Sequence, residues 1–227
     1  MNRLGVHLAF LTAALLTGVA AIAPPMDRLA DNSFAWHMLQ HLLLLYLVAL
    51  FFVLSRPFDT LAALLPKRTI VGTVRALRPL HAAISAPLLL IFFIATLWLA
   101  HFSPLYETAL QNVAVHVVEH AAFLAAGVAF WIPIVAPAPL RPIPYPGRLL
   151  YLALALPQGA LLGMAILNAR LPLYPHYITT RGSVASALYD QRDAASLMWI
   201  GGGLIVFIAF LATLGAWARR EMISEPT

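Results

Sequence analysis

The chain has 227 residues, of which 62% are hydrophobic and only 10% are charged, with a mean hydropathy of +0.85. The apolar residues form long blocks, which predicts an all-α, polytopic integral membrane bundle and excludes a mainly soluble protein. Cysteine is absent, which excludes disulfides, iron–sulfur ligation and thiolate metal sites. The net charge of +5 comes from basic residues that border apolar blocks, and no nucleic-acid-binding motif accompanies them, so we expect no nucleic-acid partner.

Six apolar blocks are long enough to cross the hydrocarbon core of a bilayer as helices, which takes about 20 residues. They lie at 4–23, 34–54, 82–101, 110–134, 148–169 and 194–218. The Pro-rich segments 133–146 and 172–175 are expected to be loops or span ends. Little chain remains for a soluble domain, so we expect residues 1–227 to form a single transmembrane domain.

The first block has two interpretations. Arg3, the apolar stretch and the small residues 20–23 resemble a secretory signal peptide. The block's length of about 20 residues favours a retained helix instead. Cleavage would leave five spans with the same orientation.

Basic residues are distributed unevenly between the two sides that six alternating spans define. One side holds Arg3, Arg56, Lys67, Arg68, Arg75, Arg78, Arg141, Arg148, Arg219 and Arg220, whereas the other holds Arg28, Arg170, Arg181 and Arg192. Because Lys and Arg are enriched on the cytoplasmic side, we predict that both termini are cytoplasmic.

The second and fourth spans each carry two histidines four residues apart, a step that stacks both rings on one face of a helix. The pairs are His37/His41 and His116/His120. In the fourth span a stripe at three- to four-residue steps also contains Asn112, Glu119, Phe123 and Gly127. We expect both pairs at a similar depth in the outer half of the membrane.

Other polar residues are expected at the same outer level. His101 ends the third span, and Asp190 and Asp193 are expected to begin the sixth. His81 lies at the cytoplasmic end of the third span, roughly 30 Å from His101 at the helical rise, and cannot share the site.

Two remaining histidines are poor candidates, His7 in the first span and His176 in an outer loop. His176 would reach the site only if its loop folds inward. We expect four aromatic residues near the outer span ends to form an interfacial belt: Trp36, Trp98, Tyr106 and Trp199.

The paired histidines have two interpretations. Imidazoles in lipid can hydrogen-bond across helices, contributing about 1 kcal/mol per bond. Two pairs beside Glu119, whose unpaired charge would cost on the order of 3 kcal/mol in lipid, instead favour a ligand or proton site. The predicted metal ligands are His37, His41, His101, His116, Glu119 and His120.

Imidazole and carboxylate suit copper, zinc or iron, and Glu119 fits either as a ligand or as a partner that orients a ligating ring. Three methionines in the outer halves of their spans, Met38, Met164 and Met198, are potential soft donors to Cu(I), although methionine is also common apolar filler.

Several ordered motifs resemble the CtaG-type assembly factors of caa3-type cytochrome c oxidase. They are HMLQHLLLLYLVA at 37–49, RPLH at 78–81, WLAH at 98–101, HVVEH at 116–120 and DQRDAASLMW at 190–199. The resemblance covers most of the chain, and the six predicted ligands match the family's polar positions, while Asp190 and Gln191 match its outer-loop motif. The chain differs in having six apparent spans, where relatives commonly have seven, and in having Arg192-Asp193 within the last motif.

The resemblance implies a multi-pass protein of the bacterial inner membrane that matures a haem–copper oxidase, handling copper without enzymatic turnover. Its expected partners are cytochrome c oxidase subunits or other assembly factors. Other functions remain open from the residues alone. They are a haem-binding electron carrier with paired histidines as axial ligands, a proton or ion pathway through Glu119, and an acid–base enzyme.

Overall fold

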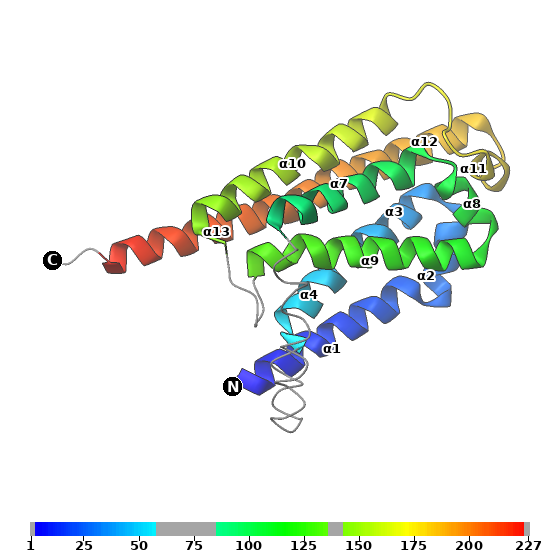
Figure 1. Ribbon diagram of the computed structural model, residues 1–227. Coiled ribbons are helices and arrows are strands. Elements are labelled where there is room, and N and C mark those ends of the chain that lie inside the picture. Colours follow the sequence, from blue (N-terminus) through cyan, green and yellow to red (C-terminus); the bar gives the residue numbers. More distant parts are fainter. Residues whose placement is uncertain (1–2, 58–84, 136–142, 225–227) are drawn as a thin grey trace.

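The computed structural model describes residues 3–57, 85–135 and 143–224, which form a bundle of long helices (Figure 1). No strand occurs within these ranges. The elements are α1 (Arg3–Ile22), α2 (Pro24–Asn32), α3 (Phe34–Leu42), the π-helix η1 (Leu43–Val48), α4 (Ala49–Leu54), α7 (Ala86–Phe102), α8 (Leu105–Gln111), α9 (Val113–Val135), α10 (Tyr145–Leu167), α11 (Pro175–Thr180), α12 (Val184–Leu197), the π-helix η2 (Met198–Gly202) and α13 (Gly203–Ser224).

Five of the described helical segments are long and apolar enough to cross a membrane, namely Arg3–Ile22, Phe34–Leu54, Val113–Val135, Tyr145–Leu167 and Val184–Ile223. A sixth span is possible if α7 and α8, which meet at a bend of 66°, act as one. The prediction of a polytopic helical membrane bundle is therefore confirmed. His81 lies outside the described residues.

The predicted start of the last span was wrong. The last span does not begin at 194, because the helix starts at Val184, where the Ser183 hydroxyl caps it by accepting the N–H of Ser186. The residues around Asp190 are polar, so the hydrophobic pattern did not indicate that the helix begins before them. By contrast, α9 continues through Pro133 and ends at Val135, one residue beyond the predicted span end at 134.

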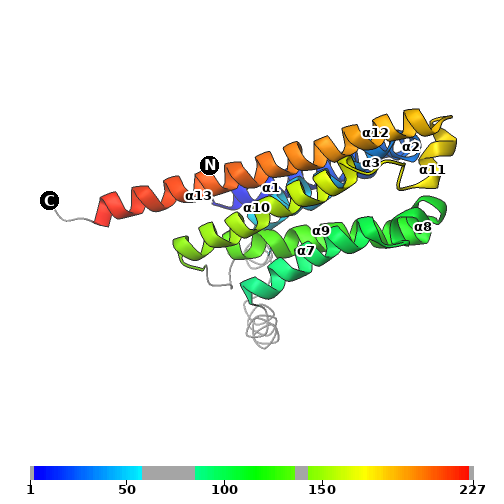
Figure 2. The same cartoon turned by 90° about the horizontal axis from the view of Figure 1, so that it is seen from above.

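The helices pack as a bundle with two distinct ends. α9 packs against α7 on one side and against η1 and α4 on another, while α10 contacts α12 and α13, and α12 contacts α3. The start of α1 and the end of α13 lie at one end of the bundle, and the short helices α2, α8 and α11 gather at the opposite end (Figures 1 and 2). The histidine pairs lie near the short helices, since they occupy the first turns of α3 and α9.

The contact between η1 and α9 is unusually close. Gly127 faces the main chain of Leu45, and a Cβ at this position would overlap the Leu45 carbonyl. The indole N–H of Trp131 donates to the Tyr46 carbonyl at 3.0 Å, which pairs a main-chain acceptor inside the π-helix. This approach brings the helix that carries His41 against the helix that carries Glu119.

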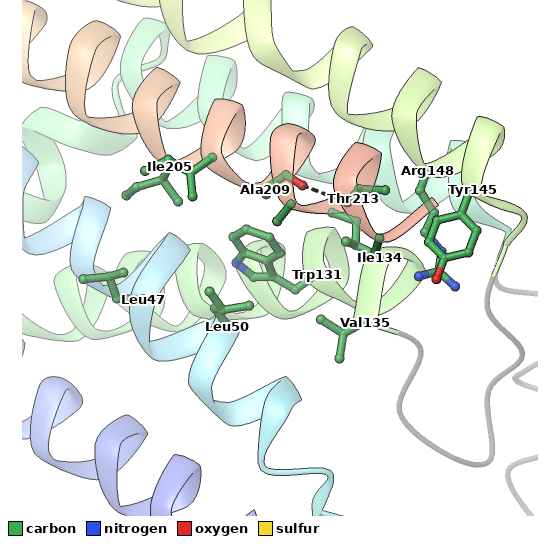
Figure 3. A pocket seen from close by; sticks show the side chains of 13 residues that line it. Leu47, Leu50, Trp131, Ile134, Val135, Tyr145, Arg148, Ile205, Ala209 and Thr213 are labelled. Atoms are coloured by element: carbon green, nitrogen blue, oxygen red, sulfur yellow. Dashed lines mark hydrogen bonds between the residues drawn. The ribbon is translucent and has the colours of Figure 1, made fainter. Parts of the chain in front are cut away.

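Figure 3 shows the apolar groove that lies further along α9, around Trp131, with Tyr145 and Arg148 at one end.

Candidate metal centre

The two histidine pairs face each other across the α3–α9 contact. Within each pair, the ring centroids of His37 and His41 are 4.4 Å apart and those of His116 and His120 are 4.1 Å apart. Between the helices, the His37 and His116 rings are 5.1 Å apart and the His41 and His120 rings 5.4 Å apart. The structure thus brings together the four rings that the sequence analysis expected to converge.

Glu119 lies between the imidazoles of α3. One of its carboxylate oxygens is 3.8 Å from Nε2 of His37 and 3.7 Å from Nε2 of His41, which is beyond hydrogen-bond distance. Two groups of side chains offer atoms within 4.8 Å of one another, His37/His116/His120 and His37/His41/Glu119, and His37 belongs to both. We call these five residues, His37, His41, His116, Glu119 and His120, the His/Glu cluster.

The cluster concentrates buried polar atoms without hydrogen-bond partners. Among the described residues, none is found for Nε2 of His37, His116 and His120, for either nitrogen of His41, or for either carboxylate oxygen of Glu119. Buried polar atoms are nearly always paired in folded proteins, so such a concentration indicates a site built for a ligand. The donor set of imidazole and carboxylate is suited to a transition metal ion.

Tyr177 of α11 orients the central ring of the cluster. Its hydroxyl lies 3.0 Å from Nδ1 of His37 and donates to the Ala30 carbonyl at 3.2 Å. Because its one proton is used there, the hydroxyl accepts the Nδ1–H of His37, and Nε2 of His37 is left unprotonated toward Glu119. Burial raises the pKa of Tyr177 well above its ordinary value, so the phenol keeps its proton.

Tyr106 of α8 extends this arrangement and corrects an expectation. It is fully buried, its hydroxyl is 3.4 Å from that of Tyr177, and its ring centroid is 5.0 Å from that of His37. It was expected in an interfacial belt, but the bend between α7 and α8 turns it inward. Neither tyrosine was predicted as part of the site. In the sequence, an aromatic residue of a binding site has the same pattern as one of an interfacial belt.

The comparisons with known proteins identify the family. The family model described as cytochrome c oxidase caa3 assembly factor matches residues 3–220, nearly the whole chain. The chain belongs to this family. It is also similar to Uncharacterized protein Mb0105 of Mycobacterium bovis and Uncharacterized protein MT0111 of Mycobacterium tuberculosis, each 25% identical over 92% of this chain, and to Uncharacterized protein ML1998 of Mycobacterium leprae at 26%. The chain spans about a third of the length of these curated relatives, with 34% of each covered. No solved structure matches.

Asp190 and Gln191, which the sequence resemblance singled out, both form hydrogen bonds to other elements. The Asp190 carboxylate accepts the Ser33 hydroxyl and the Phe34 N–H, both at 2.6 Å, at the start of α3. Gln191 accepts the Leu173 N–H at 2.7 Å and donates to the Ile166 carbonyl at 3.3 Å. Asp193 is exposed. Asp190 therefore connects α12 to the start of α3, and Gln191 connects it to the end of α10 and to the loop that contains Leu173.

His101 of α7 lies beside the cluster and belongs to neither group of potential metal ligands. Its ring centroid is 6.4 Å from that of His41. Its Nδ1 is 2.7 Å from the Leu97 carbonyl oxygen, and its Nε2 is 3.2 Å from the sulfur of Met38. Of the six predicted ligands, His101 is the one for which both ring nitrogens contact atoms outside the cluster.

The remaining candidates lie around the periphery. The loop that carries His176 does fold inward, but Nε2 of His176 lies 2.9 Å from the Asp31 carbonyl oxygen. The neighbouring Tyr177 contacts His37 instead. Met164 is 44% exposed, whereas Met198 is buried. His37, His41 and Glu119 are almost fully buried, while His116 and His120 are only half-buried. The cluster is therefore most accessible along the α9 histidines.

Proposed function

We propose that this assembly factor binds copper as cargo at the His/Glu cluster and passes it toward cytochrome c oxidase without catalysing a reaction. The observation that carries the proposal is the convergence of unpaired imidazole nitrogens and carboxylate oxygens at one buried point. Family membership supports the oxidase as the destination.

The atomic separations suit a bound ion. With metal–ligand bonds of about 2.0–2.2 Å, two ligands of a tetrahedral ion are roughly 3.3–3.6 Å apart. The distances of 3.8 and 3.7 Å from the Glu119 oxygen to the two α3 imidazoles lie close to this spacing and are too long for hydrogen bonds. A cation would also offset the cost of the buried Glu119 carboxylate, which no Lys or Arg contacts among the described residues.

The ligand set supports reversible binding. Thiolates hold copper very tightly, and the chain has no cysteine, so the ion would be held by ligands that exchange more readily. The half-buried His116 and His120 would be the first to meet an incoming ion and the last to release it.

The packing favours a small ion over a haem. The ring of His41 stacks on Phe123 at a centroid distance of 4.1 Å and meets His37 at 4.4 Å. A porphyrin between axial histidines needs a wide flat space, which these contacts occupy. An absence of Soret absorbance in protein purified from haem-replete cells is the expected result.

The site's place in the cell is part of the proposal. We propose that the cluster lies in the outer half of the bacterial inner membrane and that both termini are cytoplasmic, as the distribution of basic residues predicts. The partners would then be oxidase subunits or other assembly factors at the outer face, where the half-buried histidines open.

The test is metal binding by the purified full chain. Elemental analysis after equilibration with copper is expected to show bound copper in the wild-type protein. His37→Ala, which removes the residue shared by both groups, is expected to weaken copper binding by at least about tenfold. His7→Ala in α1, on a helix that contributes nothing to the cluster, is the matched control and should bind like the wild type.

A cellular measurement connects binding to oxidase assembly. Cells that carry His41→Ala with His120→Ala are expected to contain oxidase with less copper than cells that carry His7→Ala. Wild-type protein that binds no copper, or that prefers zinc when both are offered, would contradict the proposal. So would normal oxidase copper in the double variant.

A further inference from the structure

His101 and Met38 are both almost fully buried and meet between α7 and α3. Nδ1 of His101 lies 2.7 Å from the Leu97 carbonyl oxygen. A carbonyl oxygen can only accept, so Nδ1 carries the ring proton and Nε2 of the neutral ring has a lone pair. Nε2 faces the Met38 sulfur at 3.2 Å, and a thioether also has only lone pairs to offer.

Two acceptors therefore face each other with no hydrogen between them. Protonating His101 on both nitrogens would provide that hydrogen but would bury an imidazolium within the bundle. Among the described residues, the Glu119 carboxylate lies within ion-pair distance of His37 and His41, and no carboxylate lies within that distance of His101. Burying an unpaired charge in this way carries a large desolvation cost. A bound soft cation would instead accept both lone pairs directly as metal–ligand bonds.

We propose that Met38 and His101 form a second copper site that is selective for Cu(I). The thioether is the soft ligand that Cu(I) prefers, whereas the His/Glu cluster offers only nitrogen and oxygen. Methionine is unbranched and flexible, so the sulfur can move to admit an ion between itself and Nε2. The inference rests on the proposed function, because it assigns a second binding site to the copper that the His/Glu cluster is proposed to bind.

The second site lies where it can exchange an ion with the first. Met38 is on the same helix as His37 and His41, and the His41 ring is 6.4 Å from that of His101. A Cu(I) ion moves between them by ligand exchange, in which a bond to a His41 nitrogen forms as the bond to the Met38 sulfur breaks. The oxidation state does not change, so no electron donor or acceptor is needed.

X-ray absorption at the copper edge tests the site in the purified full chain, loaded with Cu(I) under anaerobic conditions with ascorbate. The chain contains no cysteine, so any copper–sulfur scattering must come from a methionine. We expect a sulfur scatterer in the wild-type protein, its loss in Met38→Leu, and at least a tenfold weaker Cu(I) affinity in that variant. Cu(II) affinity should change by less than about twofold, because the His/Glu cluster is intact.

Met198→Leu is the matched control, since Met198 is also buried but lies on η2. It should keep the sulfur scattering. Met-to-Leu changes nearly conserve volume, so both variants should fold, which helical circular dichroism would verify. Selenomethionine labelling of the otherwise unaltered chain gives an independent measurement, because the scatterer should change from sulfur to selenium.

The outcomes separate the two proposals. Cu(I) surrounded only by nitrogen or oxygen in the wild type, with unchanged affinity in Met38→Leu, would overturn the second site and leave the proposed function standing. Wild-type protein that binds no copper in either oxidation state would overturn both.

Discussion

At the scale of single residues, the direction in which His37 presents its nitrogens is set by Tyr177. The hydroxyl accepts the Nδ1–H of His37 at 3.0 Å, which leaves Nε2 as the lone pair that faces Glu119. Residues that orient ligating histidines through the second nitrogen commonly contribute about 10- to 100-fold to metal affinity. Tyr177 thus acts on the site through His37 without being a ligand itself.

Replacing Tyr177 with phenylalanine removes this acceptor and keeps the ring. We expect Tyr177→Phe to weaken copper binding by about 10- to 100-fold with little change in helical content. Competition titration against a copper chelator would measure the affinity. Tyr189→Phe is the control, because Tyr189 lies on α12 and is 67% exposed. Equal affinities of the two variants would show that the hydroxyl does not orient the ligand.

At the scale of elements, the start of α3 is fixed by a different helix. Ser33 is the N-cap of α3, and Asp190 of α12 accepts both the Ser33 hydroxyl and the Phe34 N–H. The first main-chain N–H groups of a helix have no partners within it, so an acidic side chain there stabilises the helix end. One turn later this helix presents His37, so α12 determines where the histidine-bearing face of α3 begins.

Asp190→Asn keeps the size of this side chain but removes the charge and places an amide N–H against a donor. We expect a loss of about 1–3 kcal/mol of stability, because hydrogen bonds to a charged group are replaced by fewer, weaker ones. Thermal unfolding of the purified protein in detergent should show a lower Tm. Asp193→Asn, three residues further along α12 and exposed, should leave the Tm nearly unchanged. A Tm for Asp190→Asn that equals that of Asp193→Asn would contradict the capping role.

At the scale of the whole molecule, the two ends of the bundle are built from different parts of the chain. The start of α1 and the end of α13 lie at one end, and α2, α8 and α11 lie at the other (Figure 1). This is the arrangement that an even number of spans produces. At the end with α2, α8 and α11, Tyr106 of α8 and Tyr177 of α11 lie against His37 of the His/Glu cluster. The distribution of basic residues along the sequence predicts cytoplasmic termini, so the cluster is predicted to face the outside.

Reporter fusions test this orientation in living bacteria. Green fluorescent protein fused after residue 227 should fluoresce and alkaline phosphatase at the same place should be inactive, because the tail is predicted to be cytoplasmic. Alkaline phosphatase inserted near Gly182, in the loop between α11 and α12, should be active. The reverse pattern would place the cluster on the cytoplasmic side and would require a different route for copper.

How much could be predicted from the sequence differs between the fold and the site. Span positions depend on local hydropathy, so the blocks at 34–54 and 148–169 agree closely with Phe34–Leu54 and Tyr145–Leu167. The four-residue spacing in the two histidine pairs likewise placed each pair on one helical face. The start of the last span was missed because polar residues of α12 face other helices and a loop, which local hydropathy does not register.

The sequence alone determined that the chain is a helical membrane bundle of this assembly factor family, with two histidine pairs able to meet. Helix periodicity and hydropathy act over a few residues, so they are readable without a structure. Only the tertiary structure decided that Tyr177, 140 positions from His37 in the chain, sets its tautomer, and that His101 faces Met38, 63 positions away, rather than Glu119. Such contacts depend on how helices rotate and bend against one another, which packing across the whole bundle determines.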